Sequence, residues 1–409
     1  MVSLISYALV LNVLLPTLCT KNTNLPFKYH TEKELEATLR NLNEMYPTIT
    51  HLYSIGQSVQ GVPLWVLCVG RFPDVHRMGI PEVKYIANIH GNEPVGRELL
   101  LHFINYLVHN YKHNEDIEAL VNSTRIHFLP ALNPDGFKTS VPGDCQGSHG
   151  RANFNNIDLN RNFPSIFGHN LSPLQPETLA AMQWFQSETF VLSATLHGGA
   201  LVAVYPFSFS VEGHRGKAKS PDDEIFKYLT KTYANAHKTM HKGDFCNETF
   251  PGGITNAAAW YPVLGCLQDY NYIKGQCFEI TLEVSCCKYP REDQLPRLWD
   301  ENKQALLELI KQVHKGIKGR VVDTSGNSVP KATIQFTTRK KKYVYQANNY
   351  GEFYKILIPG KYKVRVKAQG YLSETKLVVV TDKIISYSAI TQNFILKKQE
   401  NKKSNNTMV

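Results

Sequence analysis

The stretch that decides the fold is VKYIANIHGNE, residues 83–93, in which an apolar run ends at a histidine and a glutamate. Val83–Ile89 predicts a buried strand, and Glu98–His109 downstream has the period of a helix. His90 and Glu93 lie where the strand turns toward the helix, so they can direct an imidazole and a carboxylate at one point. A catalytic zinc takes three such protein ligands and keeps one position open. These residues alone fit a structural role equally well, with His90 ending the strand and Glu93 opening the helix.

A second apolar strand, Val191–Leu196, ends in the same way, at His197-Gly198-Gly199. In an open α/β sheet, binding sites gather at the carboxyl ends of the strands. His90, Glu93 and His197 therefore form a candidate set of two histidines and one glutamate for a single Zn²⁺. The other histidines lie mostly in polar loops, and we interpret them as structural or solvated.

Water at such a metal needs a base, and the apolar strand Phe278–Val284 offers two carboxylates. A carboxylate buried in a protein is usually paired with a cation or a hydrogen-bond donor, or it has a catalytic role. Glu279 and Glu283 share one face of this strand because they are four residues apart. One of them fits a structural ion pair and the other a general base, and the alternation does not choose between them.

Guanidinium and amide groups occur together in the run Asp158–Phe163, where Asn160 precedes Arg161. This pair is suited to binding a carboxylate. Arg151 lies a short way upstream, after Gly150. Taken singly, each arginine also fits an ordinary surface charge.

The pattern of predicted helices and strands along the chain indicates two domains. Strand-like and helix-like segments alternate from Phe27 to about Val313, which predicts an α/β domain with a mixed sheet. From about Gly316, short strands separated by Gly, Pro and Asn predict an all-β sandwich. We divide the chain into a signal peptide (1–19), a catalytic domain (25–313), a β-sandwich (316–398) and a disordered polar tail (399–409).

The N-terminus has the pattern of a secretory signal. Residues 1–18 carry no charge, Ala8–Leu18 is mostly apolar, and Thr17-Leu18-Cys19 supplies small residues for a cut after Cys19. An uncleaved anchor is the alternative. Secretion predicts disulfides, and the odd number of cysteines left from the eight leaves at least one thiol free or paired between chains. The sequence also contains four glycosylation acceptors, at Asn122, Asn170, Asn247 and Asn405.

The net charge of +10 fits a solvated basic surface, or attraction to an anionic membrane or glycan surface. A nucleic-acid partner is excluded because no nucleic-acid-binding motif accompanies the charge. We predict an extracellular, secreted protein.

In their residues and their order along the chain, these motifs resemble those of the M14-type zinc metallocarboxypeptidases, and among them those of the regulatory (N/E) branch. The resemblance runs from about Phe27 to Lys398. It is carried by Ser123–His127, Asn133–Phe137, Asp158–Pro164, Leu196–Leu201, Gln268–Tyr272 and Phe278–Glu283. It implies a mixed-sheet metallocarboxypeptidase domain with helices on both faces, followed by an all-β transthyretin-like sandwich. The implied activity is a monomeric, one-zinc exopeptidase that releases C-terminal Arg or Lys from extracellular peptides and proteins.

The resemblance also implies a role for individual residues. His90, Glu93 and His197 correspond to the zinc ligands. Glu283, rather than Glu279, corresponds to the general base, and Arg151 to the group that stabilises the oxyanion. The remaining correspondences are the residues that bind the substrate's terminal carboxylate, Asn160, Arg161 and Tyr261, and the pocket residue Gln268. The implied disulfides are Cys145–Cys287 and Cys246–Cys286, which leaves Cys277 free and Cys68 and Cys266 unassigned.

The sequence departs from the family pattern at the pocket and at the C-terminus. Ser208 stands where the branch usually has an Asp that receives a basic side chain, and Glu212 in the same loop is a candidate replacement. Cys266 stands in a run that is usually Gly-Gly-Met, where it lines the pocket or pairs with another thiol. The end, Lys397–Val409, is polar and lacks the hydrophobic tail of a lipid-anchor signal, so we expect a soluble form, with membrane association as the alternative.

Three other functions remain open at this point. The first is a catalytically weak or inactive peptide-binding protein on the same scaffold. The second is a carboxypeptidase whose preference is no longer basic because of Ser208. The third is a zinc amidohydrolase that acts on a different amide.

Overall fold

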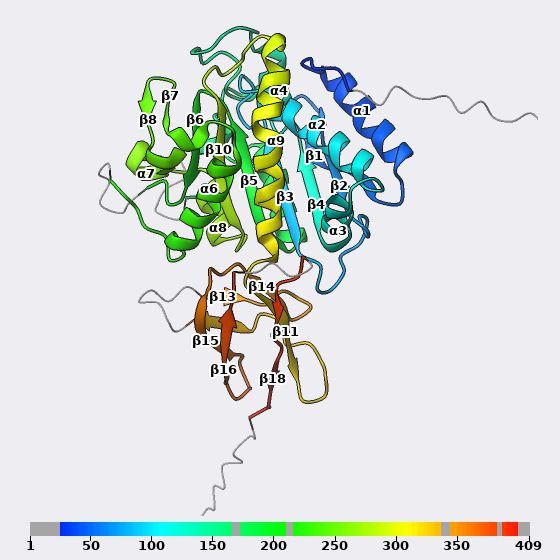
Figure 1. The fold of residues 1–409 in the computed structure, drawn as a ribbon, viewed down its shortest axis with the longest axis vertical. Coiled ribbons are helices and arrows are strands. Elements are labelled where there is room, and N and C mark those ends of the chain that lie inside the picture. Colours follow the sequence, from blue (N-terminus) through cyan, green and yellow to red (C-terminus); the bar gives the residue numbers. More distant parts are fainter. Residues whose placement is uncertain (1–24, 166–171, 210–215, 337–343, 383–386, 400–409) are drawn as a thin grey trace, which may run out of the picture.

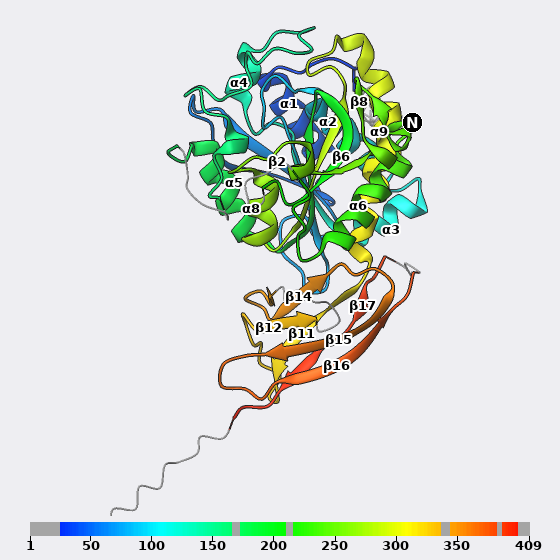
Figure 2. The same cartoon turned by 90° about the vertical axis from the view of Figure 1, so that its left-hand side faces the viewer.

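The computed structural model describes residues 25–165, 172–209, 216–336, 344–382 and 387–399. An α/β domain is followed by a smaller all-β domain (Figures 1 and 2). The predicted signal peptide, Asn170, Glu212, Asn405 and all but the first residue of the predicted tail lie outside the described residues. No helix in the described ranges has the length and apolar character needed to span a membrane.

One mixed sheet of eight strands organises the α/β domain. Its order is β1 (Thr50–Gln57), β2 (Pro63–Val69), β4 (Arg125–Leu129), β3 (Glu82–Ala87), β5 (Phe190–His197), β10 (Phe278–Ser285), β6 (Ala200–Tyr205) and β9 (Ile254–Asn256). The central strands β4, β3, β5 and β10 run parallel, and β1, β2 and β6 pair antiparallel. Parallel strands that are buried on both faces read as continuous apolar runs. That is why β3, β5 and β10 were visible in the sequence.

Helices cover both faces of this sheet. One face packs against α1 (Glu32–Met45), α2 (Val95–Asn110), α3 (Glu115–Ser123), α6 (Asp223–Ala236) and α9 (Leu295–Lys311). The other face packs against α5 (Pro176–Ser187) and α8 (Leu267–Ile273), which lie on the opposite side in Figure 2. Shorter helices are α4 (Pro134–Thr139), α7 (Ala257–Trp260) and the 3₁₀ turn η1 (Leu159–Arg161), and β7 (Asp244–Phe245) and β8 (Glu248–Thr249) form a hairpin. This arrangement confirms the predicted fold class.

The C-terminal domain is a sandwich of short strands. One sheet contains β14 (Glu352–Lys355), β11 (Ile317–Asp323), β17 (Ile390–Thr391) and β18 (Phe394–Leu396). The other contains β13 (Tyr345–Gln346), β12 (Thr333–Phe336), β15 (Gly360–Lys367) and β16 (Glu374–Val380). Inward residues alternate with outward ones along β15 and β16. Their inward side chains join those of the other sheet in the core.

The two domains meet at the amino end of β3. His76 bridges Glu82, at the start of this strand, and Glu352 of the C-terminal domain, at 2.7 and 2.6 Å. The hydrogen bonds from Glu352 and then Glu82 raise the pKa of His76 to about 9, so the bridge is charged at neutral pH. Lys355 adds a buried ion pair to Asp222 at 2.5 Å. His90 follows the other end of β3, so the C-terminal domain docks away from the candidate metal ligands.

Two disulfides lie near the exit of β10. Cys145–Cys287 and Cys246–Cys286 are the pairs that the resemblance implied. Cys68, Cys266 and Cys277 are free and buried. Of the two glycosylation acceptors in the described ranges, Asn247 is exposed in the β7–β8 turn, whereas Asn122 is half-buried.

Candidate active site

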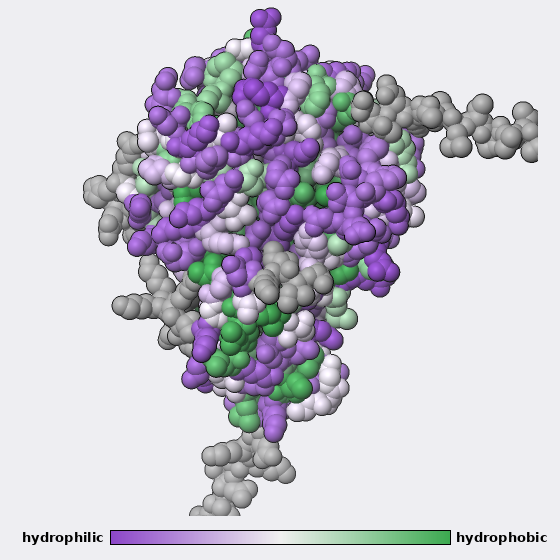
Figure 3. All heavy atoms as spheres, in the orientation of Figure 1, coloured by the Kyte–Doolittle hydropathy of each residue, from purple (hydrophilic) through white to green (hydrophobic). Residues whose placement is uncertain are grey.

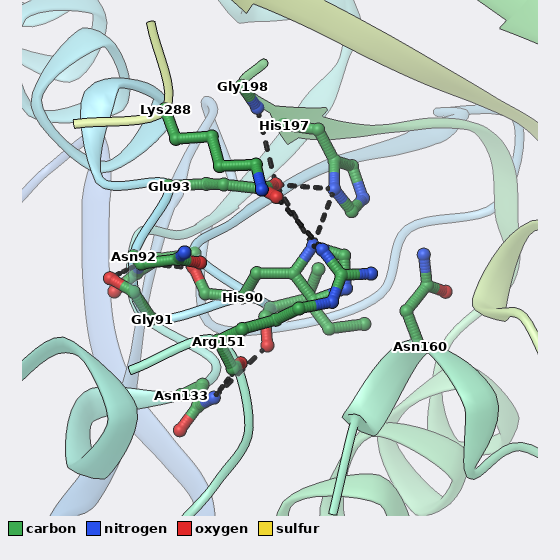
Figure 4. Close-up of polar contacts among 12 residues, drawn as sticks. His90, Gly91, Asn92, Glu93, Asn133, Arg151, Asn160, His197, Gly198 and Lys288 are labelled. Carbon is green, nitrogen blue, oxygen red and sulfur yellow. Dashed lines mark hydrogen bonds and ion pairs between the residues drawn. The ribbon is translucent and has the colours of Figure 1, made fainter. Parts of the chain in front are cut away.

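Three side chains converge at the carboxyl ends of β3 and β5 (Figure 4). Glu93 Oε2 lies 3.0 Å from His90 Nδ1 and 2.9 Å from His197 Nδ1, and the two ring nitrogens are 3.2 Å apart. Tetrahedral zinc with bonds of 2.0–2.1 Å places its ligand atoms about 3.3 Å apart. The three donor atoms therefore already have the spacing that zinc requires.

The backbone between β3 and α2 is shaped to deliver two of these ligands. β3 stops at Ala87 because Asn88 adopts a left-handed φ of 57°, and its side chain donates to the carbonyls of His90 (2.8 Å) and Gly91 (3.0 Å). A Cβ on Gly91 would lie 2.2 Å from the backbone of Gly136, so only glycine fits there. The predicted strand was therefore two residues too long, since this turn begins before His90.

The protonation states also suit a metal. Burial alone would raise the pKa of Glu93, but the neighbouring His90 and His197 bring it well below its usual range. Burial lowers the pKa of His197, which keeps its imidazole neutral. A carboxylate and a neutral imidazole are the forms that coordinate zinc, so the residues present fit the ion in charge as well as in spacing.

Asp158 is a residue of the site to which no role was assigned from the sequence. Its Oδ1 lies 3.2 Å from Nε2 of His90, and its Oδ2 accepts from Nε of Arg151 at 3.0 Å. Burial opposes ionisation of Asp158, but His90 and then Arg151 hold its pKa well below the usual range. A carboxylate on the second nitrogen of a ligand histidine orients the ring and raises its basicity. Asp158 was already visible beside Asn160 and Arg161, but no local pattern connects it to a residue so far away in the sequence.

The structure separates the environments of the two glutamates on β10. Glu279 is fully buried and accepts from Thr195 Oγ1 (2.8 Å) and Asn271 Nδ2 (2.6 Å). Glu283 pairs in register with His197, and its Oε2 is buried without a hydrogen-bond partner among the described residues. Burial, and then the negative charge of Glu93, raises the pKa of Glu283 well above its usual value. Glu279 is thus a satisfied core residue, whereas Glu283 faces the candidate metal ligands.

All the site residues expected from the sequence line one pocket of about 220 Å³. Arg151 donates to Glu93 Oε1 at 3.2 Å. Asn160 is fixed by the backbone N–H of Leu267, which donates to its Oδ1 at 3.0 Å, and Figure 4 shows it to one side of the ligand set. Tyr261, which follows α7, is 45% exposed. The expected residues in the lining are His90, Glu93, Arg151, Asn160, Arg161, His197, Tyr261, Gln268 and Glu283.

One wall of this pocket is formed by the two departures from the family pattern, Ser208 and Cys266. Cys266 is a free thiol, so it lines the pocket rather than pairing with another cysteine, and its Sγ lies 3.1 Å from Ser208 Oγ. Gln268 Nε2 reaches the same hydroxyl at 3.5 Å, while its Oε1 accepts from Thr281 at 2.9 Å. This wall of the pocket is neutral.

Comparison with known proteins identifies the family to which this chain belongs. The family model described as zinc carboxypeptidase matches residues 35–305. The chain belongs to the zinc carboxypeptidase family. A second model, the carboxypeptidase regulatory-like domain, matches residues 316–388. The protein is therefore a zinc-dependent metallocarboxypeptidase, a hydrolase that acts on peptides and proteins.

This carboxypeptidase is similar along nearly its whole length to curated relatives. It is 50% identical to carboxypeptidase M of Mus musculus over 94% of this chain and 87% of that protein. It is 44% identical to carboxypeptidase D of Homo sapiens over 93% of this chain but only 28% of that protein. The crystal structure of thrombin activatable fibrinolysis inhibitor (TAFI) aligns with a TM-score of 0.57 at 18% identity, over 70% of this chain and 75% of that one. This last likeness supports the fold alone.

Proposed function

We propose that this enzyme removes single residues from the C-termini of extracellular peptides and proteins, with a preference for Arg and Lys. The observation that carries the proposal is the shared pocket, in which the candidate metal ligands lie beside Asn160 and Arg161. A guanidinium and an amide suit a free α-carboxylate. Holding that carboxylate at a fixed distance from the metal selects the last peptide bond of a chain.

His90, Glu93 and His197 would hold the zinc, which supplies a Lewis acid that polarises the scissile carbonyl and lowers the pKa of water. Glu283 accepts the proton of the attacking water and later delivers it to the leaving amine. The burial of Glu283 supports this role, because a carboxylate with a raised pKa and an unpaired oxygen is suited to exchanging a proton.

Arg151 stabilises negative charge on the scissile carbonyl oxygen. Its guanidinium is held by Asp158, at 3.0 Å, while its Nη1 lies 3.2 Å from both Glu93 Oε1 and His90 Nδ1. A preorganised cation at this place needs no rearrangement as charge develops. Asn160, Arg161 and Tyr261 bind the terminal carboxylate, and the exposure of Tyr261 is consistent with a group that closes over bound substrate.

Alternative functions are less well supported. A peptide-binding protein without catalysis needs no base, yet a buried carboxylate with a free oxygen faces the ligand set. An amidohydrolase acting on another amide needs no carboxylate grip, yet Asn160 and Arg161 both line the pocket. We further propose a signal peptide at 1–19, a catalytic unit at 25–313 and an accessory sandwich at 316–398. All residues of the proposed site come from one chain, so the proposed catalysis does not require a second copy.

Matched peptides that end in Arg, Lys, Leu or Phe test this function. We expect loss of one terminal Arg or Lys by mass spectrometry, and we expect a zinc chelator to abolish it. The same peptides with C-terminal amides should remain intact, because they offer no carboxylate to Arg161. Efficient cleavage of the amides would contradict the exopeptidase proposal, and cleavage of only the Leu and Phe peptides would contradict the basic preference.

We also propose that the C-terminal domain contacts anionic phospholipid surfaces. Between residues 316 and 399 the acidic residues are only Asp323, Glu352, Glu374 and Asp382, among many lysines and arginines. On the outward face of the sheet, β15 pairs exposed Lys361 with Val379 and exposed Lys363 with Leu377 of β16. Leu377 is 67% exposed, and Figure 3 shows apolar side chains gathered on this domain. Cations beside exposed aliphatics suit a lipid interface better than a sulfated glycan, which offers no apolar phase.

Cosedimentation with vesicles tests the surface proposal. We expect binding to vesicles that contain phosphatidylserine and not to pure phosphatidylcholine vesicles. The K361E/K363E/R365E variant should bind at least about tenfold more weakly, since each cation near an anionic surface contributes about 1 kcal/mol. Equal binding by the variant would show that this face is not the contact.

A further inference from the structure

A buried carboxylate lies directly behind the neutral wall of the pocket. Asp269, on α8, is 5% exposed and accepts from the backbone N–H of Ser208 at 2.9 Å and from its hydroxyl at 3.3 Å. No ion pair to Asp269 occurs within the described ranges, whereas the buried Glu82 and Glu98 have a cationic or histidine partner. Removing a carboxylate from water without a counter-charge is costly. Asp269 is therefore a buried carboxyl group whose ionised form has no cation partner among the described residues.

Ser208 connects this charge to the interior of the pocket. Its hydroxyl contacts Asp269 on one side and the pocket residues Cys266 and Gln268 on the other. An aspartate at position 208, as the family pattern has it, would place its own carboxylate in the pocket. The short neutral side chain leaves only one hydroxyl between the pocket and Asp269.

We propose that Asp269 supplies the counter-charge for the basic side chain of the substrate, acting through the Ser208 hydroxyl, and thus compensates for the aspartate missing at position 208. The inference rests on the proposed exopeptidase function and identifies what sets its preference. Asp269 is a positioning residue here, because it touches Ser208 and not the substrate. Two opposite charges separated by one hydroxyl attract each other across the buried wall of the pocket, where they are only partly screened by water. Ser208 gives the substrate cation a hydroxyl oxygen that is polarised by the carboxylate behind it.

The pH dependence of selectivity gives this role a distinctive signature. Burial raises the pKa of Asp269 to about 7, against the opposing hydrogen bonds from Ser208. The titratable side chain in contact with it is Cys266, whose pKa burial raises to about 12, so this thiol stays neutral; Ser208 and Gln268 carry no charge. The cation that acts on this thiol is Arg161, which also lines the pocket. A bound Lys or Arg favours the ionised carboxylate. The selectivity for basic over apolar ends should therefore rise as the pH increases through about 7.

The experiment measures kcat/KM for two peptides that differ only in a terminal Arg or Leu, between pH 5.5 and 8.5. Asp269→Asn keeps an acceptor for the Ser208 N–H and removes the charge. We expect the Arg/Leu ratio at pH 8 to fall by about tenfold to a hundredfold, and its rise with pH to disappear. The Leu peptide reports folding and basal chemistry, and it should be cleaved at a similar rate. Asp300→Asn, which removes an exposed carboxylate on α9, is the matched control and should leave the ratio unchanged.

A rescue variant separates charge from structure. Asp269→Asn combined with Ser208→Asp restores one carboxylate at the pocket wall, and we expect it to recover the preference for Arg. An unchanged Arg/Leu ratio in active Asp269→Asn overturns the inference. If Asp269→Asn does not fold, the pH profile of the wild-type enzyme tests the inference instead. An Arg/Leu ratio of kcat/KM that does not change across pH 7 would then overturn the inference. Failure of the wild-type enzyme to cleave any peptide is a different result, which overturns the proposed function instead.

Discussion

Glu283→Gln is expected to lower kcat by about 10²–10⁴-fold while zinc stays bound, since this is the usual contribution of a general acid–base group. The glutamine occupies the same volume on β10 but cannot accept the proton of water. Because Glu283 is opposite His197 in the sheet register and is not one of the three converging donors, the metal set stays intact. The measurement is steady-state kinetics with the Arg peptide, combined with zinc analysis of the same sample.

Glu279→Gln is the matched control on the same strand and face. Glu279 accepts from Thr195 and Asn271 in the core, so its replacement perturbs buried hydrogen bonds rather than the proton transfer. We expect a lower free energy of unfolding, by about 1–3 kcal/mol, with kcat changed by less than about tenfold. If Glu279→Gln lost turnover and Glu283→Gln kept it, the assignment of the base would be wrong.

His197→Ala is expected to remove zinc and activity together. The substitution deletes one of three donors that lie within 3.2 Å of one another, and the remaining His90 and Glu93 cannot complete a three-ligand site. Zinc content after dialysis, measured by atomic absorption, should fall from one per chain to near zero. Full zinc occupancy in this variant would show that His197 is not a ligand.

Asp158→Asn is expected to weaken zinc binding without abolishing it, in contrast to His197→Ala. Losing the carboxylate behind His90 should weaken zinc binding by about 10–100-fold, the usual effect of removing such a partner. The readout is competition with a chelator of known affinity, which does not depend on turnover. Because Asp158 also fixes Arg151, kcat should fall even at saturating zinc.

Two pocket residues that look unrelated in the sequence, Ser208 and Cys266, belong to one wall of the pocket. Ser208 and Cys266 are far apart in the sequence, yet they contact each other at 3.1 Å in the same wall. From the sequence alone, Ser208 is a neutral residue where a charge was expected, and Cys266 is a thiol without an assigned role. The structure makes them one feature, with Asp269 directly behind it.

The sequence by itself determined the two-domain organisation, the mixed sheet and the candidate metal ligands. Strands β3 and β5 are buried on both faces, so their apolar runs stand out; His197 is the last residue of β5, and His90 comes shortly after the end of β3. Local pattern was sufficient because strand, turn and ligand are contiguous. Family resemblance supplied the roles of residues such as Arg151 and Tyr261, which no local pattern distinguishes from surface side chains.

Only the tertiary structure showed what orients His90, where Cys266 points, and the physical difference between Glu279 and Glu283, which the family resemblance had separated without giving a reason. Glu279 and Glu283 have the same side-chain chemistry on the same face, and they differ only in what packs against them from β5 and α8. Asp158 and Asp269 act on residues distant in the sequence, His90 and Ser208. Burial and pairing between distant segments set the charge and orientation of these groups, and alternation along a single strand carries no information about them.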